Sequence, residues 1–239
     1  MRRADDRTPD TLRDIDIQVG FVENPTGSAL IRAGRTLVLC TVHVAEQVPG
    51  FLRGTGRGWV TAEYSLLTGS TDTRTEREIS RGKPAGRSQE IQRLIGRSLR
   101  AITDMEALGE RCLYVDCDVL QADGGTRTLA ITGAYVALAT ACARLVERNY
   151  LKRDPLRDSV AAVSVGVLSG DVLLDLSYEE DARAEVDMNV VQTGRGRLVE
   201  VQGTGEAGTF DREELGCMLD MAEKGIAELS ALQKRVLGQ

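Results

Sequence analysis

Histidine is almost absent from this 239-residue chain, which contains His43 alone. Its neighbours, LVLCTVHVAE, are typical of a strand, so we expect a packed or surface strand residue. One histidine excludes acid–base chemistry that needs two and argues against a Ser-His-Asp triad. Any chemistry must therefore depend on carboxylates, arginines, backbone amides or a bound metal.

Other absences exclude whole classes of protein. The five cysteines contain no CxxC pair and four lie inside apolar runs, which favours buried thiols over disulfides or a metal centre. No apolar run approaches the roughly 20 residues needed to span a bilayer. The charged start, MRRADDRTPDTLRD, lacks the apolar stretch of a secretory signal. With 42% hydrophobic and 28% charged residues, the chain is an ordinary globular protein, and we expect it in the cytoplasm without a membrane segment.

Charge is present in two blocks of opposite sign, although the net charge is only −6. Residues 74–100 contain eight basic and three acidic side chains, whereas residues 171–187 contain seven acidic side chains and one arginine. This pattern indicates either a polyanion site beside a cation site or two unrelated solvated faces.

The order of strand-like and helical segments predicts an α+β fold. Strand-like runs cover residues 36–45, 111–120, 159–168, 172–176, 186–192 and 197–203. Apolar spacing of three and four predicts helices at 88–107, 127–149 and 211–237, the last starting with a capping box. Glycine-containing turns at 169–171 and 194–196 join strand pairs as hairpins, which argues against a doubly wound sheet.

A glycine pair between a strand and a helix is the first candidate site. In QADGGTR (121–127), adjacent glycines allow close backbone approach to an anion at a helix N-terminus. Gly125 and Thr126 add an amide and a hydroxyl, and Arg127 adds a planar fork. The segment predicts a phosphate cradle, although an ordinary turn before a helix has the same pattern.

A basic loop and an acidic cluster are the other candidates. Residues 80–87, SRGKPAGR, end in Arg87 at a helix start and suit a phosphate or, equally, an ordinary solvated loop. Asp181 precedes a strand on which Asp187 and Asn189 share one face. Such oxygen-rich clusters suit Mg²⁺, which takes one or two carboxylates plus waters and phosphate, but acidic loops before strands are common.

Together these motifs resemble the ribonuclease PH family over nearly the whole chain. The runs that carry the resemblance are FLRGTGRGWVTAEY (51–64), GRSQEIQRLIGRSLRA (86–101), DCDVLQADGGTRTLAITGA (116–134), DMNVV (187–191) and VEVQGTGE (199–206). The resemblance implies mixed β-sheets packed with a few long helices in a single catalytic domain over residues 1–239. It also implies a phosphorolytic 3′→5′ exoribonuclease that trims tRNA precursors and other RNA 3′ ends. Inorganic phosphate would attack the last phosphodiester reversibly and release nucleoside diphosphates.

The resemblance also assigns roles to residues of this chain. The attacking phosphate would be held by Arg87, Gly125, Thr126 and Arg127. Asp181 and Asp187 would be catalytic and would bind Mg²⁺, while Arg74 and Arg77 would hold RNA. The family also implies a homo-oligomer, a hexamer built as a trimer of dimers. Phosphate brings its own nucleophilic oxygen, so such an enzyme needs no histidine base.

Four positions depart from the family pattern. Asp6 stands where a glycine is usual. Thr68, Gly69 and Asp72 stand where a proline, an arginine and a histidine are usual. The last three put the RNA-anchoring loop in doubt but leave the phosphate and metal motifs intact.

Two alternatives remain at this stage. A non-catalytic ring subunit of exosome type would share the fold, but it would not need the retained phosphate and carboxylate residues. A pure RNA-binding module would need stacking aromatics on a basic platform. Aromatic residues make up only 4% of this acidic chain, so we favour the enzyme.

Overall fold

A computed structural model describes residue 3, residues 5–82 and residues 85–239. Its first sheet has the strand order β1-β2-β3-β5-β4, in which only the β4–β5 pair is parallel. The strands are β1 (Ile15–Val19), β2 (Gly27–Ala33), β3 (Thr36–Ala45), β4 (Trp59–Leu66) and β5 (Cys112–Gln121). Buried and more exposed residues alternate along β3, so one face of this sheet packs on helices and the other faces outward.

The second sheet has the order β7-β6-β8-β9 and is antiparallel throughout. Its strands are β6 (Val160–Leu168), β7 (Asp171–Leu174), β8 (Val186–Thr193) and β9 (Leu198–Gly205). Both predicted hairpin turns are present, one between β6 and β7 and one between β8 and β9. Every residue of β6 is buried because α3 and α5 both contact this strand.

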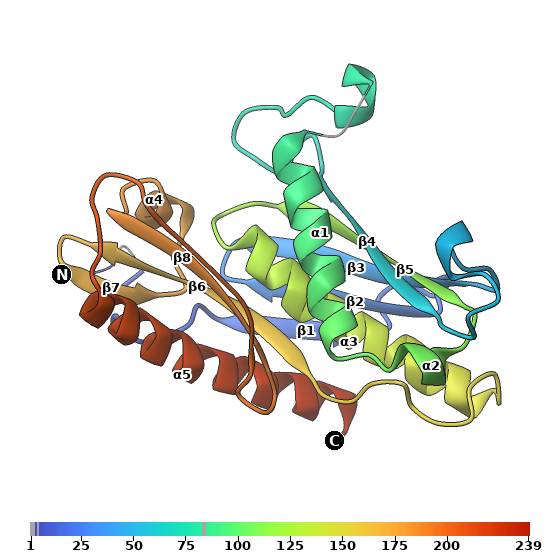
Figure 1. The fold of residues 1–239 in the computed structure, drawn as a ribbon. Helices are drawn as coiled ribbons and strands as arrows, with labels where there is room; N and C mark the ends of the chain where they lie inside the picture. Colours follow the sequence, from blue (N-terminus) through green and yellow to red (C-terminus); the bar gives the residue numbers. More distant parts are fainter. Residues whose placement is uncertain (1–2, 4, 83–84) are drawn as a thin grey trace.

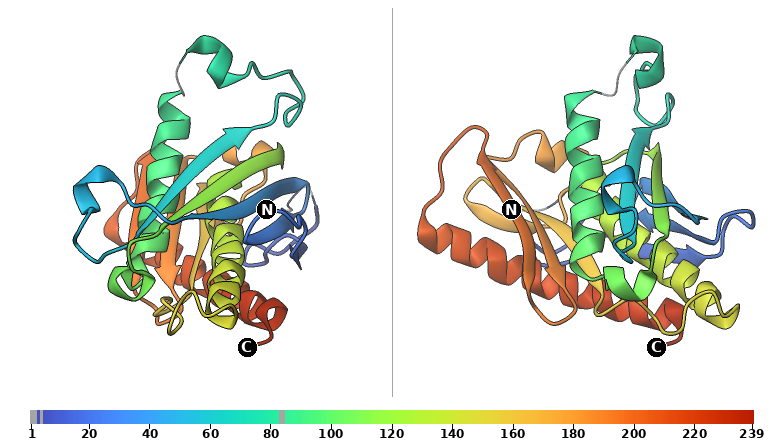
Figure 2. Two further views of the ribbon diagram at one scale, coloured as in Figure 1. Left: turned by 90° about the vertical axis from the view of Figure 1, so that its right-hand side faces the viewer. Right: turned by 45° about the vertical axis from the view of Figure 1, so that its right-hand side comes forward.

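The helices fill the space around the two sheets (Figure 1). They are α1 (Gly86–Ala101), α2 (Met105–Leu108), α3 (Thr126–Glu147), α4 (Tyr178–Asp181) and α5 (Arg212–Leu237), with short 3₁₀ turns at Gly50–Leu52 and Glu78–Arg81. Helix α1 packs on β4, α3 lies between the sheets, and α5 runs along the second sheet (Figure 2). Buried apolar side chains of the described residues form three clusters: a larger one around α1, α3 and the first sheet, a smaller one between α5 and the second sheet, and a third of Leu168, Leu173, Leu176 and Ala184.

The sequence analysis found no apolar run near the length needed to span a bilayer, but helix α3 reaches that length and apolar character. It is long and apolar enough to cross a membrane, with a mean hydropathy of 1.7 over its most apolar window. However, 78% of that window is buried inside the protein, and α3 contacts β2, β3 and β6. The helix approaches β2 closely because Gly27 has no side chain: a Cβ there would lie 2.2 Å from the carbonyl oxygen of Ala137. The apolar character of α3 therefore belongs to a core helix.

The predicted α+β class is confirmed, with differences in detail. Helix α5 begins as predicted, with Asp211 and Glu214 forming a capping box. The single helix expected at 88–107 is wrong: α1 ends at Ala101, and Asp104 caps the separate helix α2 by accepting bonds from two of its amides. Strands β1, β2 and β4 were not among the predicted runs.

Candidate active site

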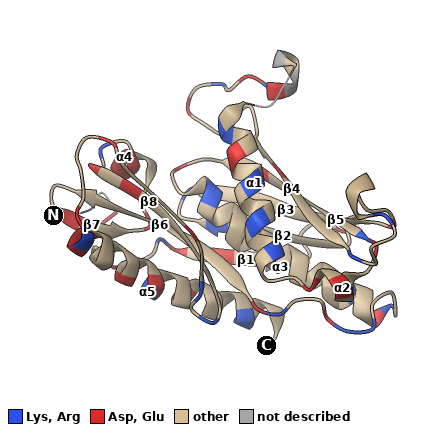
Figure 3. Ribbon diagram, in the orientation of Figure 1, with Lys and Arg blue, Asp and Glu red and all other residues tan. Residues whose placement is uncertain are grey.

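A cleft of about 1100 Å³ is lined by residues of both sheets and of the first turn of α3. It is lined by every residue predicted to hold phosphate or metal: Arg87, Gly125, Thr126, Arg127, Asp181 and Asp187. Basic residues follow α1 and acidic residues gather on α4 and the start of β8 (Figure 3). Among the described residues, the two blocks of charge seen in the sequence therefore meet at this cleft only through Arg87 of the basic block and Asp181 and Asp187 of the acidic block.

The start of α3, where the sequence predicts a phosphate cradle, forms one side of the cleft. Gly124 and Gly125 have φ angles of 78° and 62°, a left-handed conformation that favours glycine. Gly125 is the N-cap residue and has no side chain to accept bonds from the first turn. The first-turn amides of α3 therefore face the cleft at the positive end of a 22-residue helix, which suits an anion.

The hydroxyl of Thr126 is held by a residue of the first sheet. Tyr64, on β4, is only 2% exposed, and its hydroxyl donates to Thr126 Oγ1 at 2.8 Å. Burial raises the pKa of Tyr64, so its phenol stays protonated and keeps this bond. Tyr64 is the last residue of the TAEY run, and its position on a buried strand face orients Thr126.

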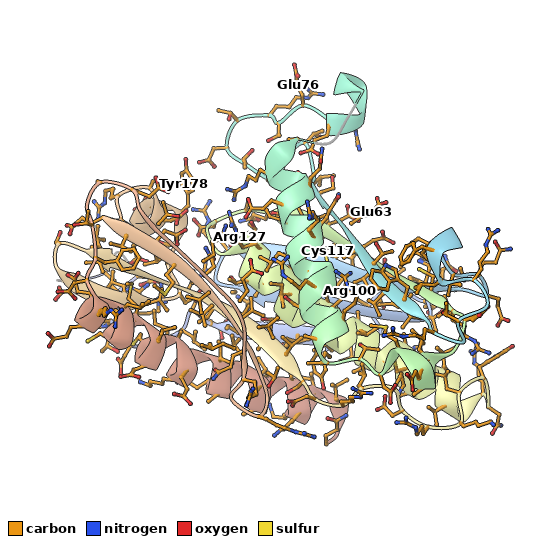
Figure 4. The ribbon with its side chains drawn as sticks, in the orientation of Figure 1. Glu63, Glu76, Arg100, Cys117, Arg127 and Tyr178 are labelled. Carbon is orange, nitrogen blue, oxygen red and sulfur yellow. The ribbon has the colours of Figure 1, made fainter. Side chains whose placement is uncertain are left out.

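The guanidinium of Arg127 is held from two further elements. Its Nη1 donates to Gln202 Oε1 at 2.7 Å, and Gln202 Nε2 donates to Glu90 Oε1 at 2.7 Å. Glu90 Oε1 also lies 3.5 Å from Arg127 Nη1. The side chain of Arg127, on α3, is therefore held by Glu90 of α1 and Gln202 of β9 (Figure 4). Sequence reasoning missed Glu90 and Gln202, although Glu90 follows Arg87 by three residues and so lies near it on α1.

The acidic side of the cleft consists of α4 and β8. Asp187 Oδ2 accepts a hydrogen bond from Asn189 Nδ2 at 3.2 Å, as the shared strand face predicted. Its Oδ1 is buried and has no hydrogen-bond partner among the described residues. Burial and the charge of Asp181 together raise the pKa of Asp187 to about 6. Burial also raises the pKa of Asp181, against the opposing charges of Arg87 and Arg127.

Asp181 and Asp187 suit an open Mg²⁺ site better than a structural metal site in which the protein supplies every ligand. No group of three or more His, Cys, Asp or Glu residues in the described part of the chain is arranged to hold a metal. Asp181 and Asp187 supply two hard oxygen ligands, and the orphaned Oδ1 of Asp187 is a free one. Mg²⁺ can bind through one or two protein carboxylates because waters and substrate phosphate complete its coordination shell, whereas a structural zinc ion is coordinated by four protein ligands.

Glu206 is a third carboxylate of the cleft that sequence reasoning missed. It lines the cleft after β9, and its charge contributes to raising the pKa of both Asp181 and Asp187. It belongs to the VEVQGTGE run, which was read as a family signature without a role for its last residue.

The predicted RNA-binding residues lie outside the cleft on the segment between β4 and α1. Arg74 and Arg77 are exposed on this segment, which stands out from the body in all the ribbon views (Figures 1 and 2). Asp72 and its neighbours line the mouth of the cleft. Of the basic loop at 80–87, Lys83 lies outside the described residues.

The departure at Asp6 has a local explanation. Asp6 has a φ of 60°, the left-handed region in which glycine is the usual residue, and its amide donates to the carbonyl of Arg3. Aspartate tolerates this conformation better than most residues with a side chain, so the turn is retained.

Comparison with known proteins agrees with this geometry. Residues 11–143 match domain 1 of the 3′ exoribonuclease family, and residues 158–225 match its domain 2. The chain belongs to the ribonuclease PH family. It is 57% identical to "Ribonuclease PH" of Syntrophomonas wolfei over 238 residues, covering 100% of both chains. It is 56% identical to "Ribonuclease PH" of Bacillus subtilis, covering 99% of this chain and 97% of that relative.

Solved structures show the same fold at lower identity. The Archaeoglobus fulgidus exosome with RNA bound to the active site matches with a TM-score of 0.82 and 23% identity. The match covers 96% of this chain and 92% of that one. The ribonuclease PH-type fold and family expected from the sequence are therefore confirmed.

Proposed function

We infer that this chain removes nucleotides from RNA 3′ ends by phosphorolysis, and we propose a role for each group in the cleft. The chain is a phosphorolytic 3′→5′ exoribonuclease with inorganic phosphate as its co-substrate, in keeping with its full-length relatives. The observation that carries the residue assignment is that one cleft is lined by Arg87 and Arg127, the first turn of α3, and the carboxylates of Asp181 and Asp187.

In the proposed reaction, an oxygen of inorganic phosphate attacks the phosphorus of the last phosphodiester. The bond from that phosphorus to the 3′ oxygen of the preceding nucleotide breaks. The products are a nucleoside diphosphate and an RNA one nucleotide shorter with a free 3′ hydroxyl. The exchange of a phosphodiester for a phosphoanhydride makes the reaction reversible, so the enzyme also adds nucleotides from diphosphates.

The basic wall of the cleft binds and orients the attacking phosphate. Arg127, fixed by Gln202 and Glu90, presents its fork to the oxygens of the phosphate, and Arg87 adds a second cation at the first turn of α1. The amide of Gly125 and the hydroxyl of Thr126 complete the cradle. Positioning and charge stabilisation of this kind supply most of the catalysis in phosphoryl transfer.

The acidic wall supports the metal. Asp181 and Asp187 would hold Mg²⁺, which would supply positive charge to stabilise the transition state of phosphoryl transfer. Asp187 must be ionised for this role, so its raised pKa ties activity to pH. The charge of Glu206 contributes to the raised pKa of Asp187, and the hydrogen bond from Asn189 orients its carboxylate.

The remaining proposals concern the substrate and the assembly. Arg74 and Arg77 contact the RNA, tRNA precursors are a substrate, and six copies form a ring as a trimer of dimers. The single domain over residues 1–239 is supported by α3, which contacts both sheets. A cytoplasmic location fits the five free cysteines.

Product analysis on a 3′-extended tRNA tests the function directly. With phosphate and Mg²⁺, the protein should release nucleoside diphosphates, and a doubly substituted Arg87→Lys, Arg127→Lys protein should remain folded but need a higher phosphate concentration for the same rate. Release of monophosphates without phosphate would reject phosphorolysis. RNA binding without any release would instead favour a non-catalytic ring subunit.

A further inference from the structure

Arg13 is a buried arginine that no part of the proposed chemistry uses. It lies just before β1 and is 6% exposed. Its Nη2 donates to Asp175 Oδ1 at 2.7 Å, its Nε to Asp175 Oδ2 at 3.0 Å, and its backbone amide to the same Oδ2 at 2.8 Å. Its Nη1 donates to the carbonyl oxygen of Asp123 at 2.6 Å.

These contacts join two segments that are far apart in the chain. Asp123 belongs to the phosphate loop, residues 121–127, which ends at the start of α3. Asp175 follows β7 and precedes α4, which ends at Asp181. One guanidinium therefore bonds to both the phosphate side and the acidic side of the cleft.

The two segments touch directly beside Arg13. A Cβ on Gly124 would lie 2.6 Å from the carbonyl oxygen of Leu176 and 2.8 Å from the amide nitrogen of Tyr178. Asp175 has a φ of 53°, a left-handed conformation that costs a non-glycine residue free energy. Its bonds to Arg13 offset that cost and fix the turn that leads into α4.

We propose that the Arg13–Asp175 pair is a positioning device that sets the spacing between the phosphate loop and the catalytic carboxylates. The proposal rests on the function proposed above, since it assigns the pair to the geometry of that same cleft. A shift of the acidic segment relative to the loop would separate the bound phosphate from Asp181 and Asp187. Misplacement by about 1 Å at a reacting centre can lower a rate by roughly a hundredfold.

A planar fork is required for this role. Arginine offers five N–H groups at fixed angles and can satisfy a carboxylate and a carbonyl oxygen together, whereas lysine offers one point of charge. Arg13→Lys therefore keeps the buried charge near Asp175 but loses the bond to Asp123. Arg32→Lys is the matched control, because Arg32 pairs at 2.7 Å with Asp14 on the exposed surface of the same region.

The experiment measures steady-state phosphorolysis of a 3′-extended tRNA, with KM for phosphate and kcat determined separately, together with RNA affinity in phosphate-free buffer. For Arg13→Lys we expect KM for phosphate to rise about tenfold or more, kcat to fall, and RNA affinity to stay within about twofold. Arg32→Lys should match the wild type in all three. A merely structural role would lower the folded fraction, which reduces kcat in proportion but leaves KM unchanged.

A second variant keeps the test decisive if Arg13→Lys does not fold. Thr36 Oγ1 accepts from the amide of Asp123 at 3.0 Å and donates to the carbonyl of Gly124 at 2.8 Å, so it holds the phosphate loop from β3. Thr36 Oγ1 also accepts from Arg13 Nη1 at 3.4 Å, so Thr36→Val loosens the contact of Arg13 with the loop as well as both bonds above, with little change in shape. It should raise KM for phosphate. Thr36→Ser retains the hydroxyl and should restore it.

The outcomes separate this proposal from the function on which it rests. If the wild type releases no diphosphates with phosphate present, the proposed function fails. If the wild type is phosphorolytic but folded Arg13→Lys, or Thr36→Val in its place, retains the wild-type KM and kcat, the positioning role is overturned while the function stands.

Discussion

Glu180 and Asp181 are consecutive residues of α4, yet their surroundings shift their pKa values in opposite directions. Burial favours the neutral form of Glu180, but paired hydrogen bonds from Arg3 at 2.8 and 2.7 Å outweigh it and lower its pKa to about 2. Burial also favours the neutral form of Asp181, and the charges of Arg87 and Arg127 do not outweigh it, so the pKa of Asp181 is raised. One side of the short helix is therefore anchored by an arginine while the next residue faces the cleft.

The same contrast separates Asp175 from Asp187. Burial favours neutral Asp175, but its bonds with Arg13 hold its pKa below the ordinary value. Asp187 has one amide partner and an orphaned oxygen, and its pKa rises to about 6. Both oxygens of the anchoring carboxylates Glu180 and Asp175 accept hydrogen bonds from arginine, whereas Asp187 keeps one buried oxygen without a protein partner. Incomplete pairing of this kind marks a functional site at the expense of stability.

Loss of the charge on Asp187 should have the largest effect. Asp187→Asn preserves shape but removes an oxygen anion that the metal needs, so we expect the rate of diphosphate release to fall by about a hundredfold or more. RNA affinity should change little, because Asp187 is not a phosphate-binding cation. Asp14→Asn, at an exposed site, is the control. Near-normal turnover in Asp187→Asn would remove the metal role from this residue.

Substitutions on α4 test the anchoring half of the comparison. Glu180→Gln leaves Arg3 buried without its anionic partner and should lower the free energy of unfolding by about 3 kcal/mol at neutral pH. Asp181→Asn should leave it unchanged or raise it. The contribution of Glu180 is present above its unfolded pKa of 4.5 and disappears as pH falls toward about 2. Urea unfolding of both variants measures these free energies. Equal losses of stability in Glu180→Gln and Asp181→Asn would contradict the assignment of Glu180 as the anchoring carboxylate.

The Asp187→Asn variant should also be more stable than the wild type above pH 6. Folding raises the pKa of Asp187 from 3.8 to about 6, so ionisation disfavours the folded state as pH rises through that window. We expect the variant to gain about 2–3 kcal/mol at pH 7.5 and to lose that advantage by about pH 4. Urea unfolding in metal-free and phosphate-free buffer is the measurement. A gain that does not depend on pH would point to packing instead of charge.

Local signals in the sequence were sufficient for much of the fold. Apolar spacing predicted the main helices, and the capping box at Asp211 predicted where α5 begins. The break before α2 was missed although Asp104 is a good N-cap residue, because the apolar periodicity continues across it. Strand β4 was missed although Val60, Ala62 and Tyr64 alternate inward, because Thr61, Glu63 and Ser65 interrupt the apolar residues of this run.

The sequence likewise indicated some residues of the candidate site and missed others. The residues proposed to contact substrate lie in contiguous motifs, so the sequence could indicate Arg127 and Asp187. Residues that hold them, such as Gln202 and Arg13, act across strand pairings and loop contacts. Arg13 and Asp175 are 162 positions apart, and nothing in one sequence shows that they pair. Register and tertiary packing decide such contacts, which are available only from the fold.

The smallest expected effect concerns the loop where this chain departs from its family. A Cβ on Gly69 would meet no atom within 4 Å, so an arginine fits there, and Asp72 is exposed at the mouth of the cleft. Gly69→Arg with Asp72→His adds a cation and removes an anion beside the proposed RNA path. Each new phosphate contact should steepen the slope of log affinity against log salt by roughly 0.7. Binding of tRNA should tighten, while cleavage of a short oligonucleotide that does not reach the loop should change little. Gly50→Arg, at another open glycine on a distant 3₁₀ turn, controls for added charge. If tRNA affinity stays the same at every salt concentration, this loop does not lie on the RNA path.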